Sequence, residues 1–368
     1  MKRYPPIMIP LAEPDIGPKE LKYVKDAVES GWVSSLGYYV EKFENDFAKY
    51  CNCKYGVTVS NGTVALHLAL SALGIKKGDE VIIPNFTFAA TANAVIYTGA
   101  TPIFVDCEQD TWNIDVSLIE EKITPKTKAI MPVHIFGHPC DMEPILEIAK
   151  KYSLFIIEDC AEAHGAEYRK KKVGLFSDIS CFSFYGNKII TTGEGGICLT
   201  NSDELNQKMR LLRDHGMRKE NKYWHEVVGF NYRMTNLQAA LGLAQLERIE
   251  EFIKIKRRNA QEFKNLLKDV DWITLPVEKE YAKNIYWVFA ILINENSRYS
   301  RNQIIDILGK EGIECRHFFY PLSIMPPYKE HYSYPVSEKI SKQGLWLPSS
   351  TKLKPSDINY IHHKLINI

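Results

Sequence analysis

Short apolar runs alternate with longer amphipathic segments through the first two thirds of the chain. Six runs have the length of buried strands, and they lie at 80–84, 101–106, 129–137, 154–160, 180–186 and 196–200. Stretches with apolar residues at helical spacing separate several of them, as at 63–73 and 142–152. Continuous apolar strands that alternate with helices are typical of a mostly parallel sheet covered on both faces, so the pattern predicts an α/β fold.

The pattern changes in the last third of the chain. A long helical pattern covers 235–267, and the charged run at 247–258 within it is typical of a solvated helix face. A strand, a helix that ends at a glycine and a second strand-like run follow at 284–294, 300–312 and 313–322. We therefore expect a large domain over 1–250, with the N-terminal segment included, and a small α+β C-terminal domain over 251–368.

Composition narrows the class of protein. The chain has 46 Lys and Arg against 45 Asp and Glu, and a net charge of +1 gives no support to binding of nucleic acid or of a membrane surface. The apolar runs are too short for a signal peptide or a membrane span. Eight cysteines include no CxxC pair, and "CNC" at Cys51 and Cys53 has no matching second pair. We expect reduced cysteines, no metal site and a cytoplasmic location.

Two ionisable residues follow or end predicted strands. Lys188 lies in "SFYGNKIITTGEGG" (183–196), where an aromatic run passes into threonines and glycines, and Asp159 ends an apolar run. Taken singly, such residues are more often a solvated lysine and a capping aspartate. Together they suit pyridoxal phosphate, which needs an anchoring amine and an acid that keeps its ring nitrogen protonated. Ligands of parallel sheets lie beyond the carboxyl ends of the strands.

Two further features fit the same cofactor. "SNGT" at 60–63 joins a strand to an Ala- and Leu-rich helix, so backbone N–H groups and the Thr63 hydroxyl can cradle a phosphate that Gly62 allows to approach. Phe88 follows a strand and can stack on a flat ring, although an aromatic residue there is more often part of the core. Motifs for nucleoside triphosphates or dinucleotides are missing from the sequence.

These segments resemble the DegT/DnrJ/EryC1/StrS family, which are aspartate-aminotransferase-like (fold type I) pyridoxal-phosphate enzymes that aminate nucleotide-linked keto-sugars. Nearly the whole chain is similar, and the segments that carry the resemblance are 31–50, 60–84, 156–165, 183–196 and 229–249. Shorter stretches are similar to the perosamine-forming branch of the family, and they lie at 138–143, 185–188, 223–236 and 318–328.

The resemblance implies roles around the cofactor. Lys188 would anchor the cofactor covalently and then move the proton, Asp159 would pair with the pyridine nitrogen, and Phe88 would stack on the ring. Glu162 would lie beside the cofactor, at a place where the perosamine branch also carries glutamate. The residues that would bind the cofactor phosphate are Gly62, Thr63 and Ser183, with Asn231 of a neighbouring subunit.

The resemblance also implies a substrate site and an oligomer. The side chains expected near the sugar nucleotide are Trp32, Arg233, His317 and Tyr320, with Arg233 contributed across the interface of a homodimer. His134 and His138 are expected to be structural or close to the substrate, without a metal.

The implied reaction has two halves. L-Glutamate would convert pyridoxal phosphate to pyridoxamine phosphate, and the amine would then pass to C4 of a 4-keto-6-deoxyhexose nucleotide. The expected substrate is GDP-4-keto-6-deoxy-D-mannose, which gives GDP-perosamine for a surface glycan such as O-antigen lipopolysaccharide. Two alternatives keep the chemistry, with a dTDP- or UDP-4-keto-6-deoxyglucose (viosamine type) or a UDP-4-keto N-acetyl sugar. A remote alternative is a non-catalytic protein that binds the sugar nucleotide or the cofactor.

Overall fold

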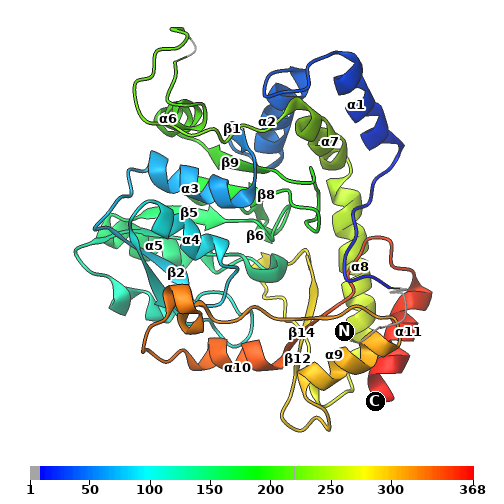
Figure 1. The fold of residues 1–368 in the computed structure, drawn as a ribbon. Helices are drawn as coiled ribbons and strands as arrows, with labels where there is room; N and C mark the ends of the chain where they lie inside the picture. Colours follow the sequence, from blue (N-terminus) through cyan, green and yellow to red (C-terminus); the bar gives the residue numbers. More distant parts are fainter. Residues whose placement is uncertain (1–8, 219) are drawn as a thin grey trace.

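A seven-stranded sheet forms the centre of the molecule in this computed structural model, which describes residues 9–218 and 220–368 (Figure 1). The strand order is β1-β9-β8-β5-β4-β2-β3, and β9 alone of these seven runs antiparallel to its neighbours. In chain order the strands are β1 (Tyr55–Val59), β2 (Glu80–Pro84), β3 (Thr101–Val105), β4 (Thr127–Ile130), β5 (Phe155–Asp159), β8 (Ile179–Ser183) and β9 (Gly196–Thr200). The predicted α/β fold with a mostly parallel sheet is confirmed.

Helices cover both faces of this sheet because its strands are apolar on both sides. Val81 and Ile83 of β2 pack in a core with α3 (Gly62–Ala72), α4 (Ala90–Tyr97) and α6 (Asp203–Arg213). Ile82, between them, points to the opposite face and packs with α5 (Met142–Tyr152). Over β8 and β9 that opposite face is covered by α2 (Tyr38–Tyr50) and α7 (Asn236–Leu246), and α1 (Pro18–Glu29) packs against α7.

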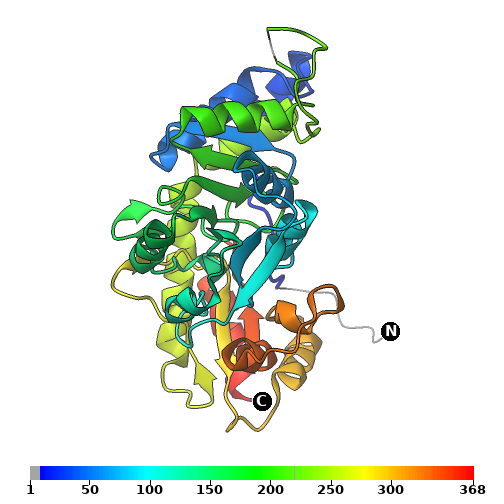
Figure 2. The ribbon, with the colours of Figure 1, turned by 90° about the vertical axis from the view of Figure 1, so that its left-hand side faces the viewer.

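A smaller sheet lies beside the C-terminal helices (Figure 2). Its order is β10-β12-β14-β13, all antiparallel, and its strands are β10 (Ile273–Thr274), β12 (Phe289–Ile293), β13 (Arg316–His317) and β14 (Gly344–Leu347). The helices of this part are α8 (Ile249–Leu267), α9 (Arg301–Lys310), α10 (Pro335–Gln343) and α11 (Pro355–Ile366). Phe263, Ile304 and Ile358 join α8, α9 and α11 into one core with this sheet.

Short elements fill the connections. A third sheet has the order β11-β6-β7, with β6 (Glu167–Tyr168), β7 (Lys171–Lys172) and β11 (Ala282–Lys283). The 3-10 helices are η1 (Val116–Leu118), η2 (Glu120–Lys122), η3 (Ile135–Gly137), η4 (Leu322–Ile324) and η5 (Pro326–Tyr328). Ile9 pairs with Ile313, so the described chain starts beside its C-terminal part. The division into domains at residue 250 stays a prediction.

The long helix predicted over 235–267 is wrong in one respect, because the structure has two helices there. α7 ends at Leu246 and α8 begins at Ile249, with Arg248 outside helical geometry at the junction. Arg248 is held in this turn by ion pairs of 3.1 Å each to Asp15 and Glu20. The charged run after it is not uniformly solvated either, since Lys256 is only 7% exposed.

Four predicted strands are shorter than expected. In place of 129–137, β4 ends at Ile130, because Pro132 cannot donate to a ladder and Phe136 has a left-handed φ of 54°. In place of 180–186, β8 ends at Ser183. The runs at 284–294 and 313–322 are reduced to β12 and to β13.

Candidate active site

The predicted cofactor residues gather at the carboxyl end of the central sheet. Asp159 ends β5, Ser183 ends β8, and Gly62 begins the helix that follows β1. Lys188 lies in the connection from β8 to β9, five residues beyond the strand. Backbone hydrogen bonds join Phe184 to Gly195 and to Thr192 across this connection. Lys188 therefore lies in a loop held by these bonds, whereas the sequence suggested the end of a strand.

The amine of Lys188 lies against an aromatic ring and near two negatively charged carboxyl groups. Its Nζ is 3.9 Å from the ring centroid of Trp287. Burial lowers the pKa of Lys188, and the negative charges of Glu162 and Asp159 oppose that shift. A lowered pKa increases the fraction of neutral amine, the form that attacks a carbonyl carbon or accepts a proton.

Asp159 is a buried carboxylate with two hydrogen-bond donors. Thr91 donates its hydroxyl to Oδ2 at 2.9 Å, and the N–H of Ala161 donates to Oδ1 at 3.2 Å. Burial raises the pKa of Asp159, while these donors and the charge of Lys188 act the other way. The sequence analysis did not find Thr91, because a threonine inside a helix carries no signal of its own.

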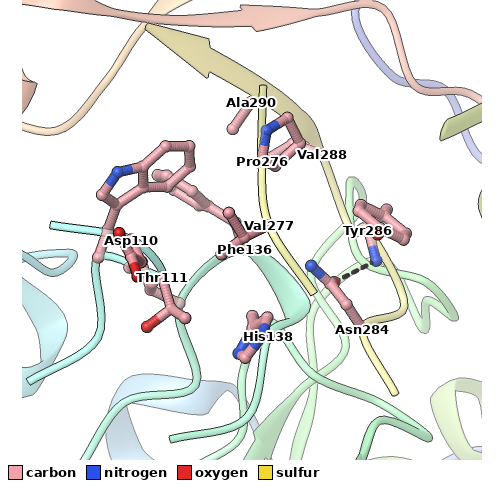
Figure 3. Close-up of a pocket in the computed structure, with 12 residues that line it drawn as sticks. Asp110, Thr111, Phe136, His138, Pro276, Val277, Asn284, Tyr286, Val288 and Ala290 are labelled. Atoms are coloured by element: carbon pink, nitrogen blue, oxygen red, sulfur yellow. Dashed lines mark hydrogen bonds between the residues drawn. The ribbon is translucent and has the colours of Figure 1, made fainter. Parts of the chain in front are cut away.

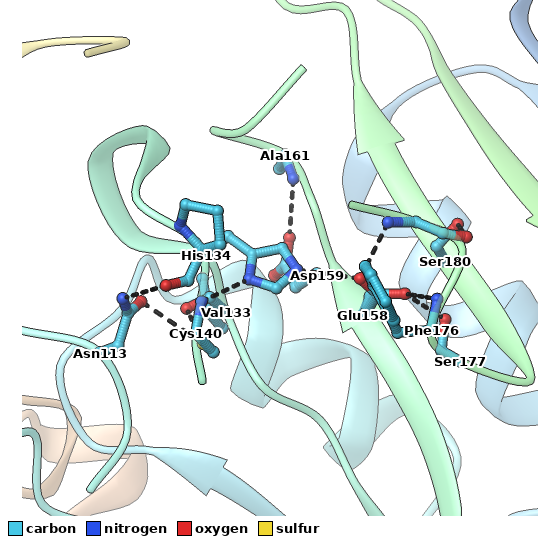
Figure 4. A network of polar contacts seen from close by, with 12 residues as sticks. Asn113, Val133, His134, Cys140, Glu158, Asp159, Ala161, Phe176, Ser177 and Ser180 are labelled. Atoms are coloured by element: carbon cyan, nitrogen blue, oxygen red, sulfur yellow. Dashed lines mark hydrogen bonds and ion pairs between the residues drawn. The ribbon is translucent and has the colours of Figure 1, made fainter. Parts of the chain in front are cut away.

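A second buried network lies behind Asp159 (Figure 4). The N–H of Cys140 donates to Nδ1 of His134 at 3.0 Å, which places the imidazole hydrogen on Nε2, 3.0 Å from Glu158. Glu158 also accepts from Ser177 and from two backbone N–H groups. His134 and Glu158 lie within 4.8 Å of Cys160, a spacing that suits a metal, but their ligand atoms already have partners.

Glu162 completes a group of three ionisable side chains. It is 4% exposed, and its Oε2 accepts the N–H of Phe136 at 2.8 Å. Burial raises the pKa of Glu162 to about 7, and the charge of Asp159 acts in the same direction, whereas Lys188 and the Phe136 N–H oppose the rise. Near neutral pH this carboxyl group can therefore either donate or accept a hydrogen bond.

The residues predicted to cradle the phosphate, called the phosphate cup below, lie together: Gly62 and Thr63 at the start of α3 and Ser183 at the end of β8. Asn61 caps α3 by accepting the N–H of Val64 at 3.0 Å, and Gly62 and Thr63 are the first residues of the helix. The first N–H groups of a helix have no partner within it and attract anions. A Cβ at Gly62 would lie 2.6 Å from Cβ of Ser183, so only glycine allows this approach.

The remaining predicted residues lie at the surface. Phe88 is 58% exposed, with its ring 5.8 Å from that of Phe319. His317 and Tyr320 have ring centroids 5.1 Å apart, and both are exposed. Trp32 is 57% exposed and accepts a hydrogen bond from Asn236 through its carbonyl.

Asn231 and Arg233 form a separate polar cluster. Oδ1 of Asn231 accepts from Nε and Nη2 of Arg233 at 3.0 and 2.9 Å. Arg233 also pairs with Asp214 at 2.9 Å and contacts His215 at 3.1 Å. Their side-chain contacts are therefore with each other and with the end of α6, and the carbonyl of Tyr232 between them accepts the N–H of Ser60.

These residues fit pyridoxal phosphate. The amine and the buried Asp159 supply the two groups that the cofactor ring requires, and the glycine at the start of α3 brings the first N–H groups of the helix close to the Ser183 hydroxyl, where a phosphate can bind. Among the residues that the structure describes, no helix is long and apolar enough to span a membrane.

Comparison with known proteins places this geometry in a family. The model of the DegT/DnrJ/EryC1/StrS aminotransferase family matches residues 14–366. The chain belongs to this family. It is therefore an aminotransferase that depends on pyridoxal phosphate, as the resemblance implied, and the alternative of a non-catalytic binding protein is not supported.

Relatives and solved structures match over nearly their full length. The chain is 49% identical over 356 residues to a GDP-perosamine synthase of Escherichia coli O157:H7, covering 96% of each chain. It is 46% identical to a GDP-perosamine synthase of Caulobacter vibrioides, again over 96% of each. The structure of S. venezuelae DesV superposes with a TM-score of 0.90 at 34% identity, covering 95% of this chain and 93% of DesV.

The first prediction concerns Lys188. Lys188→Ala should lower the rate of amino transfer from glutamate at least about 100-fold, because the amine that moves the proton is gone. The rate is measured in a single turnover by mass spectrometry. Lys171→Ala, at an exposed lysine of β7, is the control and should keep the parent rate. A Lys188→Ala enzyme as fast as its parent would contradict the assignment.

The second prediction concerns the pH dependence of stability. The folded-state pKa of Glu162 is about 7 against an ordinary 4.5, so the folded state holds a proton that the unfolded chain releases between these values. Stability of the cofactor-free protein should therefore fall as pH rises from 4.5 to 7, by about 3 kcal/mol from this group. Glu162→Gln should remove that fall in denaturant unfolding curves. Glu147→Gln, at an exposed position, is the control and should keep the fall in stability with pH. If the free energy of unfolding changed with pH in the same way in the parent and in Glu162→Gln, Glu162 would not hold a buried proton.

Proposed function

We propose that this aminotransferase passes the amino group of L-glutamate to C4 of a nucleotide-linked 4-keto-6-deoxyhexose. The substrate is GDP-4-keto-6-deoxy-D-mannose, and the products are GDP-perosamine and 2-oxoglutarate. The observation that carries this proposal is the similarity to three GDP-perosamine synthases at 44 to 49% identity over 93 to 96% of the chain. GDP-perosamine would serve the synthesis of a surface glycan such as O-antigen.

The chain's own residues divide the work in the following way. Gly62, Thr63 and Ser183 bind the cofactor phosphate, and the exposed face of Phe88 packs on the cofactor ring. Asp159 holds the proton on the ring nitrogen, and its donors Thr91 and Ala161 fix its orientation. When bound, the cofactor supplies an electron sink that stabilises negative charge at the carbon that loses its proton.

Lys188 and Glu162 are proposed to handle protons together. Nζ of Lys188 would take the proton from the α-carbon of the amino donor and, in the second half of the reaction, would deliver a proton to C4 of the keto-sugar. Glu162 lies beside this amine and is anchored by the Phe136 N–H, so its carboxyl group stays fixed while the charge of Lys188 changes.

Exposed side chains are proposed to bind the sugar nucleotide. His317 ends β13 and forms an aromatic pair with Tyr320, and an aromatic pair can pack on a sugar ring or on a base. Trp32 offers a third exposed ring from the loop after α1.

We propose further that two copies share their active sites. Apolar side chains are exposed in two places, from the loop before α2 to its first residue and in the loop after α6, and such surface commonly marks an interface. They are Trp32, Val33, Leu36, Tyr38, Tyr223, Trp224, Val227 and Val228. Asn231 and Arg233 follow the second loop, so a partner that covers it would receive both residues.

We propose a cytoplasmic location as well. The structure has eight free cysteines, and Cys181 of β8 lies opposite Cys198 of β9 in register without a disulfide. Reduced thiols in such positions suit a reducing compartment.

The substrate proposal is tested with a panel of keto-sugars. Purified enzyme with pyridoxal phosphate and L-glutamate receives GDP-, dTDP- and UDP-linked 4-keto-6-deoxy sugars in separate reactions, and mass spectrometry follows ketone to amine. We expect kcat/KM for the GDP-mannose-derived ketone to exceed the others at least about 10-fold, since contacts to base and C2 are absent for the others. A higher kcat/KM for a dTDP- or UDP-linked ketone would contradict the GDP-sugar proposal. The product would then be a viosamine-type or an N-acetyl amino sugar.

Shared sites predict complementation between two inactive variants. Lys188→Ala and Arg233→Ala each lose activity alone, but a mixed dimer has one site with both residues intact. Co-expression should restore about a quarter of the parent activity, because random pairing makes half the dimers mixed and each has one intact site of two. Two differently tagged Lys188→Ala chains are the control and should stay inactive. Failure of the mixed pair to regain activity would place Arg233 in the site of its own subunit.

A further inference from the structure

Trp287 joins the C-terminal part of the chain to the loop that carries Lys188. The side chain is buried, and its ring face lies 3.9 Å from Nζ of Lys188. Its indole N–H donates to the carbonyl of Asn187 at 2.7 Å. One rigid side chain therefore contacts the amine of Lys188 with its face and the backbone of the preceding residue with its edge.

The backbone of Trp287 is linked through Phe136 to Glu162, the carboxyl group that faces Lys188. Its N–H donates to the carbonyl of Phe136 at 3.1 Å, and the N–H of Phe136 donates to Glu162 at 2.8 Å. Next to this contact, Ile285 donates to the carbonyl of Gly137 at 3.2 Å. A pocket of about 10 Å³ lies beside these contacts and is lined by Phe136, Tyr286 and Val288 but not by Trp287 itself (Figure 3). The backbone hydrogen bonds on either side of Trp287 therefore fix its place in the chain.

Lys256 holds the same residue from α8. Its Nζ donates to the carbonyl of Trp287 at 2.9 Å, and the side chain is buried. Burial lowers the pKa of Lys256 to about 7, so a lysine at this place costs stability that an apolar residue would not. Neither the family pattern nor the cofactor chemistry described above uses this residue.

We infer that Trp287 is a positioning residue for the amine of Lys188, and that Lys256 keeps Trp287 in place. The inference rests on the proposed catalytic role of Lys188. The ring face stabilises the amine in its charged form, and the indole N–H fixes the loop that presents it. Since proton transfer needs the amine at a defined place, loss of either contact should slow catalysis before it affects binding.

The first test measures the glutamate half-reaction through the change in cofactor absorbance. The rate of this half-reaction does not depend on which sugar is the substrate. Trp287→Phe keeps a ring and loses the indole N–H, and should lower the rate constant about 10-fold or more with KM for glutamate within about threefold. Trp346→Phe is the matched control, since this buried tryptophan packs on Trp287 at 5.6 Å and its indole N–H has no partner among the described residues. It should keep a rate within about twofold of the parent.

A double-mutant cycle separates positioning from a general packing role. In the Lys188→Ala enzyme, added methylamine can replace the missing amine and restore part of the half-reaction. In that background Trp287→Phe should lower the rate constant less than about twofold, because the residue that Trp287 positions is absent. An equal loss with and without Lys188, or an unchanged rate in the single variant, would overturn the inference. A parent enzyme without any half-reaction would instead overturn the proposed function.

Lys256→Met supplies a second variant that does not depend on the fold tolerating a change at Trp287. It removes the buried charge and the hydrogen bond while keeping the length of the side chain. The midpoint of thermal unfolding should stay the same or rise, while the half-reaction slows severalfold. A parallel loss of stability and rate would assign Lys256 a structural role alone and contradict the inference.

The last readout needs neither cofactor nor turnover. In cofactor-free protein with lysines labelled at the ε carbon, nuclear magnetic resonance gives the pKa of Lys188, and Lys188→Arg assigns its signal. Trp287→Leu should lower that pKa by about half a unit or more, since the ring face that favours the ammonium form is lost. Trp346→Leu should leave it unchanged. An unchanged or raised pKa in Trp287→Leu would overturn the contact between ring and amine.

Discussion

One desolvated amine that faces two buried carboxyl groups is the constraint on which the site depends. Charges are costly inside a protein unless hydrogen bonds or opposite charges compensate them. Asp159 has Thr91 and Ala161 as donors, Glu162 has the Phe136 N–H, and both carboxyl groups face the charge of Lys188. The chain therefore keeps polar backbone and side-chain groups at the end of the sheet that an ordinary core would exclude.

This arrangement explains why the chain departs from regular structure nearby. β4 stops at Ile130, and the following residues turn through Phe136 in a left-handed conformation. That turn directs the Phe136 N–H to Glu162 and its carbonyl to Trp287. A longer strand would have used both groups in a sheet ladder, so the interruption leaves them available to join Glu162 to the C-terminal part of the chain.

The sequence predicted the sheet and most of its strands, because continuous apolar runs are local signals, but it placed the ends of β4 and β8 too far along the chain. The cup at Gly62, the carboxylate at Asp159 and the lysine at Lys188 followed from residue type and order alone. Trp287 and Lys256 could not be predicted in the same way. Trp287 is one aromatic residue in an apolar run, and Lys256 lies in a charged run, so their positions depend on how distant segments meet. The break at Arg248 has the same origin, since its partners Asp15 and Glu20 lie far away in the sequence.

The close approach of Gly62 to Ser183 has a consequence for evolution and for design. The first turn of α3 lies so close to the end of β8 that a methyl group added at residue 62 would clash with Ser183. Positions 62 and 183 therefore cannot enlarge independently, and any drift toward larger side chains here must move a helix relative to a strand. An engineer who wants a cup for a different anion has freedom at the hydroxyl of residue 183, whereas residue 62 is closed to substitution by its neighbour across the cup.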